Sequence, residues 1–189
     1  FILIFLSSIL IFNPIAIADE LEEELLTTQY YLSYDLDNEE VMYSKNIHKK
    51  IFPASLTKLM TALLLIDKYN LTDVIEINLP EDYLYEGKVA YLNSGQVVNV
   101  ETLLEFILIY SANDACFAAA LSVSGSVDNF VSLMNLKADE LGMNNTNFTN
   151  PDGLDDINHF TTLNDLVLLS KEILKNYELV TLIIKPSFI

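Results

Sequence analysis

The sequence is poor in cysteine, histidine, glycine and tryptophan, and each shortage excludes a class of chemistry. Its 189 residues include a single cysteine, Cys116, so it can form neither an intramolecular disulfide nor a multi-cysteine metal site. Two histidines, His48 and His159, are too few for a typical histidine metal centre. Five glycines leave little room for a glycine-rich phosphate loop. We therefore expect no metal and no cofactor.

Basic residues are also scarce. The chain has 10 Lys and Arg against 27 Asp and Glu, a formal net charge of −17 at pH 7. Nucleic acids and anionic membrane surfaces both attract basic segments, so this balance argues against either partner. Hydrophobic residues make up 51% of the chain and charged residues 20%, which suits one domain with a sizeable core.

The first eighteen residues have the pattern of an export signal. Residues 1–12 are mostly apolar, Asn13-Pro14 breaks the run, and Ala16-Ile17-Ala18 fits a small-residue cleavage site. There is no initiator Met and no basic segment before the apolar run, so we expect a partial signal peptide at 1–18. A retained membrane anchor is the alternative, but this interrupted stretch is short for a membrane span. The sequence therefore favours export with cleavage.

The remainder divides into an acidic segment at residues 19–28 and one domain at residues 29–189. No turn, cap or polar tail follows the last expected helix and its apolar continuation. We therefore expect the domain to be incomplete and truncated at its C-terminus.

The residue pattern predicts a β-hairpin followed by a series of helices. Aromatic and β-branched runs at 30–35 and 41–45 flank the turn residues Asp37-Asn38. A short strand is expected at 74–77, and helices are expected at 54–69, 100–110, 113–123, 126–141 and 162–176. Strands first and helices afterwards indicate an α+β fold.

The first expected helix carries a serine and a lysine one turn apart. Ser55 and Lys58 share one face, with Cβ atoms about 5–6 Å apart. Apolar residues surround the axis of this helix, so it should be buried, and burial disfavours the charged form of an amine. A neutral Lys58 amine can accept the proton of the Ser55 hydroxyl, and the helix N-terminus favours a developing oxyanion. The pair can therefore act as nucleophile and base without histidine.

Chance is the alternative explanation of Ser-x-x-Lys, with Ser55 as a helix cap and Lys58 in solvent. However, no other serine in the chain has a lysine three residues later. A solvated lysine is also hard to place on a helix that is apolar on every side. These two observations favour the catalytic interpretation.

A second candidate motif, Ser111-Ala112-Asn113, lies at the junction of two expected helices. Such a junction can present a hydroxyl, which relays a proton, and an amide, which holds a substrate amide. A helix cap is the commoner meaning of these residue types. Ser44-Lys45-Asn46 matches the same pattern, but it precedes Ser55 and lies in an expected strand.

Ser-x-x-Lys followed by Ser-x-Asn is the signature of penicillin-binding proteins and class A β-lactamases. The longer stretches Pro-Ala-Ser-Leu-Thr-Lys-Leu-Met-Thr-Ala (53–62) and Ser-Ala-Asn-Asp-Ala (111–115) resemble the D-alanyl-D-alanine carboxypeptidase family of low-molecular-weight penicillin-binding proteins, as do residues 130–153 and 159–166. The resemblance covers roughly residues 29–175 in unbroken order. It implies a β-lactamase/transpeptidase-like fold, in which a helical cluster packs against an antiparallel sheet.

The resemblance also implies roles for four residues. Ser55 matches the acylated nucleophile, Lys58 its general base and Ser111 the proton-shuttling serine, while Asn113 matches the residue that holds the peptide carbonyl of the substrate. The implied reaction removes the terminal D-alanine from the pentapeptide stem of peptidoglycan through a Ser55 acyl-enzyme.

The same resemblance implies partners and a location. β-Lactam antibiotics would act as inhibitors, and no nucleic acid or cofactor would take part. The protein would work in the periplasm, and a C-terminal segment beyond Ile189 would attach it to the inner membrane.

The third family motif, Lys-Thr-Gly, does not occur in this sequence. In the family it lies further toward the C-terminus, which agrees with the expected truncation. The Glu-x-x-Leu-Asn loop of class A β-lactamases is also absent, because no Leu-Asn follows the acidic residues at 152–156. A serine carboxypeptidase is therefore favoured, and a class A-like β-lactamase or a non-catalytic penicillin-binding homologue are the alternatives.

Three further residues that invite functional interpretation have simpler explanations. Cys116 lies within an alanine-rich expected helix and should be a small core residue. His159 precedes an expected helix and should cap it or orient the nearby loop. His48 lies beside two lysines and should be exposed.

Overall fold

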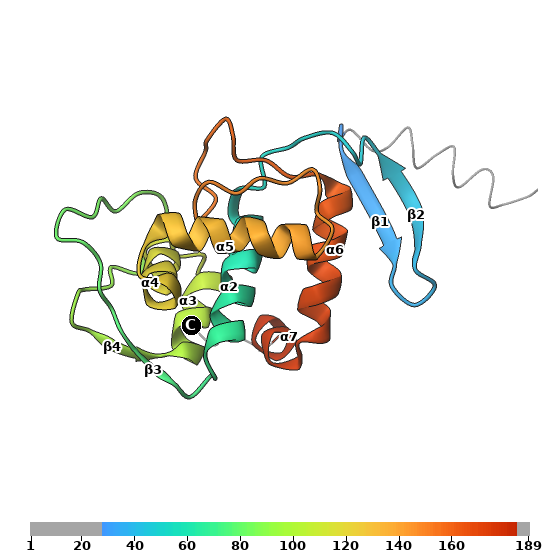
Figure 1. Cartoon of the computed structure of the whole chain (residues 1–189). Coiled ribbons are helices and arrows are strands. Elements are labelled where there is room, and N and C mark those ends of the chain that lie inside the picture. The colour runs from blue at the N-terminus through green and yellow to red at the C-terminus, as the bar shows by residue number, and fades with distance from the viewer. Residues whose placement is uncertain (1–27, 185–189) are drawn as a thin grey trace, which may run out of the picture.

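The structure is a computed structural model that describes residues 28–184. The expected signal peptide at 1–18 and almost all of the acidic segment at 19–28 lie outside the described residues. Figure 1 shows a cluster of helices with a β-hairpin at one side. This arrangement, helical with small antiparallel sheets, confirms the α+β class.

Two pairs of strands, a 3₁₀ turn and six α-helices make up the described part of the chain. In chain order they are β1 (Tyr31–Asp35), β2 (Glu40–Lys45), the 3₁₀ turn η1 (Ala54–Leu56), α2 (Thr57–Lys68), β3 (Val74–Glu76), β4 (Val97–Asn99), α3 (Val100–Leu108), α4 (Asn113–Ser124), α5 (Val127–Glu140), α6 (Leu163–Lys175) and α7 (Tyr177–Ile184). Every element expected from the sequence is present, and β4 and α7 are additional.

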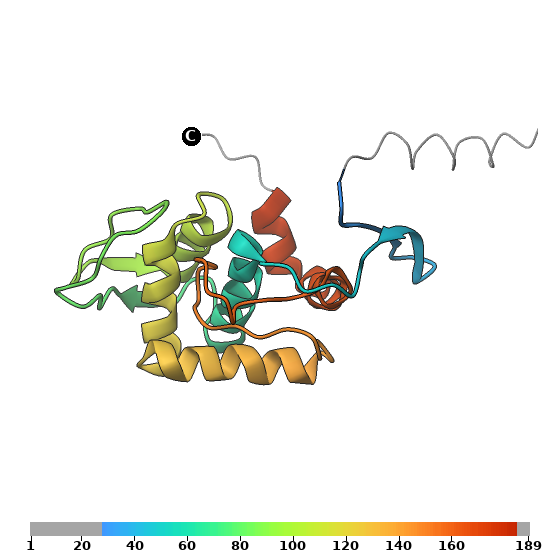
Figure 2. The same cartoon turned by 90° about the horizontal axis from the view of Figure 1, so that it is seen from above.

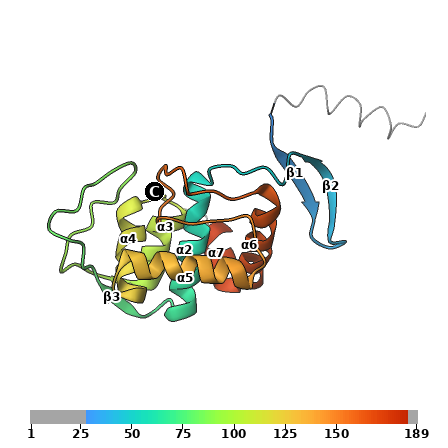
Figure 3. The same ribbon diagram turned by 45° about the horizontal axis from the view of Figure 1, so that its top comes forward.

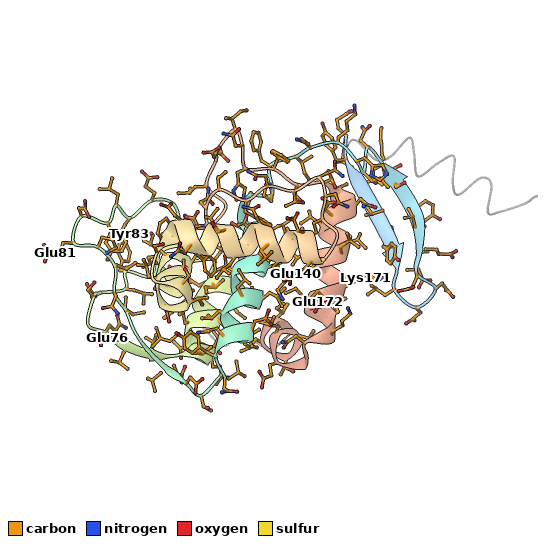
Figure 4. All side chains as sticks on the ribbon, in the orientation of Figure 1. Glu76, Glu81, Tyr83, Glu140, Lys171 and Glu172 are labelled. Atoms are coloured by element: carbon orange, nitrogen blue, oxygen red, sulfur yellow. The ribbon has the colours of Figure 1, made fainter. Side chains whose placement is uncertain are left out.

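The strands form two separate antiparallel pairs, β1 with β2 and β3 with β4. Lys171 of α6, labelled in Figure 4 beside the hairpin, anchors the first pair to the helices. Its Nζ donates to Glu39 Oε1 at 2.7 Å and to the Tyr34 hydroxyl at 3.4 Å. Figure 2 shows this hairpin and the loop at 77–96 on opposite sides of the helical cluster.

Helix α2 forms the centre of the molecule. It contacts α3, α4, α5 and α6, and α5 runs across it in Figures 1 and 3. Its buried residues are Thr57, Lys58, Met60, Thr61, Ala62, Leu63, Leu64 and Leu65. The prediction of a helix buried on every side is therefore confirmed. Burial of this apolar surface is the main contribution that holds the other helices around α2.

The start of this helix differs in detail from the prediction. Residues 54–56 form a 3₁₀ turn before the α-helix begins at Thr57, and Ala54 has a positive φ of 48°. Pro53, which precedes this turn, has no backbone N–H, so it fits the position just before a helix. Ser55 and Lys58 nevertheless remain one turn apart.

The starts of α5 and α6 follow standard capping chemistry. The Ser126 hydroxyl accepts the Asn129 N–H at 3.2 Å, and the Thr162 hydroxyl accepts the Asp165 N–H at 3.1 Å. Within residues 28–184 no single helix is long and apolar enough to cross a membrane.

Candidate active site

Ser55 and Lys58 lie at the N-terminal end of the buried helix. The Ser55 side chain is exposed, whereas Lys58 is only 3% exposed although it carries an amine. Lys58 Nζ points at the serine and lies 3.5 Å from Ser55 Oγ. The hydroxyl is therefore open to solvent, and the amine below it is enclosed.

Two further oxygens hold the Lys58 amine. Nζ donates to Asn113 Oδ1 at 2.8 Å and to the backbone carbonyl of Asp152 at 2.7 Å. These partners come from the first turn of α4 and from the loop between α5 and α6. A buried amine needs such partners, because an unpaired buried donor is costly.

Ser111 completes the group at the junction of α3 and α4. Its hydroxyl donates to Ser55 Oγ at 3.3 Å, and its backbone has a positive φ of 63°. Strained backbone of this kind gathers at functional sites. The structure thus brings together all four residues that the sequence singled out, Ser55, Lys58, Ser111 and Asn113.

The second match to Ser-x-Asn lies elsewhere. Ser44 is an exposed residue of β2, and Asn46 follows it in the turn after that strand. The Asn46 side chain donates to the Gln29 carbonyl at 2.8 Å. This motif has no contact with the Ser55 group and serves the hairpin.

Asn113 is fixed on two sides. Its side-chain Nδ2 donates to the Glu86 carbonyl at 2.9 Å, and its backbone N–H donates to the Lys88 carbonyl at 2.7 Å. Gly87 lies so close that a Cβ at that position would stand 2.7 Å from Asn113 Nδ2. The loop at 77–96 therefore forms one wall of the site.

Two adjoining hollows, of about 320 and about 200 Å³, open at this group of residues. Both are lined by Ala54, Ser55, Lys58 and Ser111. The larger continues along α3, and the smaller continues toward Lys88, Asp152 and Leu154. A substrate that enters either hollow meets the Ser55 hydroxyl.

The loop at 150–153 packs directly against the start of α2, and no pattern in the sequence predicted this contact. The Thr61 hydroxyl donates to the Pro151 carbonyl. Gly153 lies against Ala54 so tightly that a Cβ there would overlap the Ala54 carbonyl. The glycine therefore allows the loop to approach the residue that precedes Ser55.

His159 links the same loop region to the first turn of α2. The Thr149 N–H donates to His159 Nδ1 at 3.0 Å, so the proton of the neutral ring is on Nε2 and points at the Thr57 hydroxyl, 2.8 Å away. Burial lowers the pKa of His159, which keeps the ring neutral. The expected orienting role is confirmed, although its partner on α2 was not foreseen.

Cys116 and His48 also lie as expected. Cys116 is fully buried in α4, and burial raises the pKa of its thiol, so it stays protonated. His48 is exposed. Residues 28–184 contain no cluster of three or more histidine, cysteine, aspartate or glutamate side chains arranged to hold a metal ion.

Asp114, the neighbour of Asn113, was not predicted as a site residue but fixes the loop wall. Its carboxylate accepts the Ala90 N–H and the Leu92 N–H, each at 2.9 Å, and the Ala115 N–H at 3.0 Å. It is fully buried. The carboxylate therefore holds the loop at 77–96 against the N-terminus of α4.

The helical cluster, together with Ser-x-x-Lys and Ser-x-Asn meeting in one site, defines the β-lactamase/transpeptidase-like class of proteins. The family described as D-alanyl-D-alanine carboxypeptidase, Peptidase S11, matches residues 18–186. The chain therefore belongs to the D-alanyl-D-alanine carboxypeptidase family of serine peptidases.

Individual relatives agree with this assignment. The chain is 38% identical over 150 residues to D-alanyl-D-alanine carboxypeptidase DacF of Bacillus subtilis (77% of this chain, 38% of the relative). The crystal structure of D-alanyl-D-alanine carboxypeptidase DacD from Francisella tularensis superposes with a TM-score of 0.79 at 31% identity (84% of this chain, 40% of that chain). Penicillin-binding protein D2 from Listeria monocytogenes, in its cefotaxime-bound form, gives a TM-score of 0.69 at 28% identity (80% and 63%). The chain thus spans less than half the length of the first two relatives.

Proposed function

We propose that the protein containing this chain is a serine-type D-Ala-D-Ala carboxypeptidase. Ser55 attacks the carbonyl of the penultimate D-alanine, the terminal D-alanine leaves, and water then releases the shortened stem peptide from the Ser55 ester. Family membership supports the reaction type, and the geometry around Ser55 supports the assignment of the residues.

The hydrogen bonds of Lys58 are the observation that carries this proposal. A neutral amine has two N–H donors and one lone pair. Asn113 Oδ1 and the Asp152 carbonyl can only accept, and they lie at 2.8 and 2.7 Å from Nζ. They therefore take both donors, which leaves the lone pair for the third neighbour, Ser55 Oγ at 3.5 Å. This arrangement supports the assignment of Lys58 as the general base.

The remaining groups suit the later steps. The Ser111 hydroxyl, 3.3 Å from Ser55 Oγ, can pass a proton to the departing amine. Asn113 uses one N–H of its amide on Glu86, so the other is left for a substrate carbonyl. The Ser55 backbone N–H, at the first turn of the helical segment, supplies part of an oxyanion hole.

The substrate class and location follow from the same proposal. Pentapeptide stems of peptidoglycan lie outside the inner membrane, and the apolar stretch at 1–18 with its small-residue cleavage site supports export. β-Lactams would acylate the same serine, which is supported by the cefotaxime-bound form of the Listeria relative.

Labelling by a fluorescent penicillin tests the proposal. The full-length protein should form a persistent adduct, and Ser55→Ala should abolish it. Ser111→Ala should slow labelling, whereas Ser44→Ala, in the exposed copy of the same motif, should label at the rate of the unaltered protein. Equal labelling of Ser55→Ala and the unaltered protein would refute the nucleophile.

Release of D-alanine from a pentapeptide is the second readout. The carboxypeptidase should release it at a rate that depends on Ser55. Rapid hydrolysis of a chromogenic cephalosporin without a persistent adduct would instead indicate a β-lactamase. A protein that neither forms the penicillin adduct nor releases D-alanine would be a non-catalytic homologue.

A further inference from the structure

The smaller hollow beside Ser55 carries a cation that the proposed reaction does not use. Lys58 and Lys88 are the two basic residues among the described residues that line it. The Lys58 amine is buried and held by Asn113 and by the Asp152 carbonyl, whereas Lys88 is exposed on the loop at 77–96. The Lys88 ammonium is therefore the positive charge that a molecule entering this hollow can reach.

No acidic side chain neutralises this ammonium within the described chain. The ion pairs among residues 28–184 use Lys137, Lys171 and Lys175, and Lys88 takes part in none of them. The sequence has 27 acidic residues against 10 basic ones, so acids that could serve as partners are plentiful. The charge on Lys88 is thus left for an anion from outside the chain.

Two contacts fix the position of Lys88 at the site. Its backbone carbonyl accepts the Asn113 N–H at 2.7 Å, and its ammonium lies 4.2 Å from the centre of the Tyr110 ring. Tyr110 directly precedes Ser111 in the chain. A cation is attracted to the face of an aromatic ring, so this contact keeps the ammonium near the junction that carries Ser111. Backbone and side chain therefore both tie Lys88 to residues of the site.

Asp152 is the one acid among the described residues that line the smaller hollow. Its side chain is 2% exposed, and burial raises the pKa of its carboxyl, which favours the neutral form. Glu86 is an exposed acid two residues before Lys88, but it does not line the hollow. An anion in this hollow can therefore approach Lys88 without a strong opposing charge in the lining.

Asn113 indicates which part of the substrate occupies this hollow, because it lines the smaller hollow and not the larger one. In the function proposed above, its amide holds a peptide carbonyl of the substrate. That carbonyl belongs to the residue before the penultimate D-alanine, since the carbonyl of the D-alanine itself is the one that Ser55 attacks. Lys88 therefore stands beside the acyl part that stays on Ser55, and not beside the D-alanine that leaves.

We propose that Lys88 binds a carboxylate on the acyl part of the substrate, next to the carbonyl that Asn113 holds. The proposal rests on the function proposed above and adds a preference among its substrates. The carboxylate concerned is distinct from the terminal carboxylate of the departing D-alanine. The ammonium has three N–H donors, and hydrogen bonds between charged partners are stronger than neutral ones. Lys88 takes no part in proton transfer or bond breaking, and it selects which acyl group reaches Ser55.

Two penicillins that differ by one carboxylate test this preference. Carbenicillin carries a carboxylate on the carbon next to its side-chain amide carbonyl, and benzylpenicillin has a hydrogen there. The rate at which each acylates the full-length protein is measured by competition with a fluorescent penicillin. The readout is the ratio of the two rates, carbenicillin over benzylpenicillin, because a general effect of a substitution on acylation cancels in it.

Lys88→Gln should lower this ratio about 2- to 5-fold, the size expected for a charge pair in an open hollow. Lys88→Arg keeps the charge and should keep the ratio, whereas Lys88→Glu reverses the charge and should lower the ratio further. Lys50→Gln is the matched control. Lys50 is also exposed and its ammonium lies over an aromatic ring, 3.5 Å from the centre of Phe160, but it lines neither hollow.

The outcomes separate this role from the proposed function. A ratio that falls in Lys88→Gln and Lys88→Glu, and not in Lys88→Arg or Lys50→Gln, supports the role. A ratio that both uncharged and reversed variants share with the unaltered protein, or an equal fall in Lys50→Gln, overturns the role and leaves the proposed function intact. Labelling that Ser55→Ala does not abolish overturns the proposed function, and the Lys88 role with it.

Discussion

Gly153→Ala should displace Ser55, although Gly153 packs on Ala54 and not on Ser55 itself. Gly153 has a positive φ of 88°, and its backbone lies against the residue before Ser55. A Cβ there would overlap the Ala54 carbonyl oxygen, stand 2.5 Å from the Ala54 carbonyl carbon and 3.0 Å from Thr57 Oγ1. The Ala54 backbone and the buried Thr57 hydroxyl cannot move aside as the end of a flexible side chain can.

Two contributions set the size of the effect. An L-residue at this φ is disfavoured by about 1–2 kcal/mol, and overpacking of a tight contact adds about 1–3 kcal/mol. The free energy of unfolding should therefore fall by about 2–5 kcal/mol. If the loop yields and the fold survives, Ala54 and Ser55 shift, and a displacement of about 1 Å at a reacting atom slows catalysis about 100-fold.

Gly95→Ala is the matched control. Gly95 has nearly the same φ, 84°, but nothing lies within 4 Å of the position of a Cβ. It should lose only the conformational contribution of about 1–2 kcal/mol and label at the normal rate. Urea unfolding and the rate of penicillin labelling measure both variants. A Gly153→Ala protein that is as stable as Gly95→Ala and equally reactive would refute the packing argument.

Three further predictions follow from buried contacts. Burial lowers the pKa of His159 below its usual value of about 6.5, so the unfolded chain binds more protons than the folded protein below that pH. The stability of the protein should therefore decrease as pH falls below about 6.5. Thermal unfolding from about pH 5 to 8 should show this decrease in the unaltered protein and in the control His48→Gln, but not in His159→Gln. Asp114→Asn, which places an amide where three backbone N–H groups converge, should lower the free energy of unfolding by about 2–3 kcal/mol, and an unchanged urea midpoint would contradict this. Gly87→Ala, at a φ of 68°, should lose the same conformational contribution of about 1–2 kcal/mol as Gly95→Ala, and it should in addition push the Asn113 amide away from its present position and slow penicillin labelling. A normal labelling rate would contradict that wall of the site.

The sequence predicted the helices and the Ser55–Lys58 pair because both depend on local patterns. Apolar residues on every side of 56–66 predict burial of that helix whatever packs against it, and the structure surrounds it with four helices. The spacing of Ser55 and Lys58 guarantees a shared face. The meeting of Ser111 and Asn113 with this pair was predicted through the family resemblance, since no local pattern reports a contact across more than fifty residues.

The remaining contacts of the site could not be predicted for the same reason. The carbonyl of Asp152 binds Lys58 and the backbone of Gly153 packs on Ala54, yet neither contact involves a residue type that marks it in the sequence. The positive φ of Ala54 is similarly invisible, because alanine rarely adopts it and only the surrounding packing holds it there. His159 was recognised as a candidate for orienting a loop, but its partner Thr57 depends on the tertiary fold.

If the buried Lys58 amine activates Ser55, replacement of that amine in Lys58→Met should slow the acylation of Ser55. Methionine is similarly long and unbranched and removes only the amine, so the helix should remain packed. Without its base, Ser55 should react with a fluorescent penicillin about 100- to 10,000-fold more slowly than in the unaltered protein. A folded Lys58→Met protein that labels at the normal rate would show that Lys58 is not the base that activates Ser55.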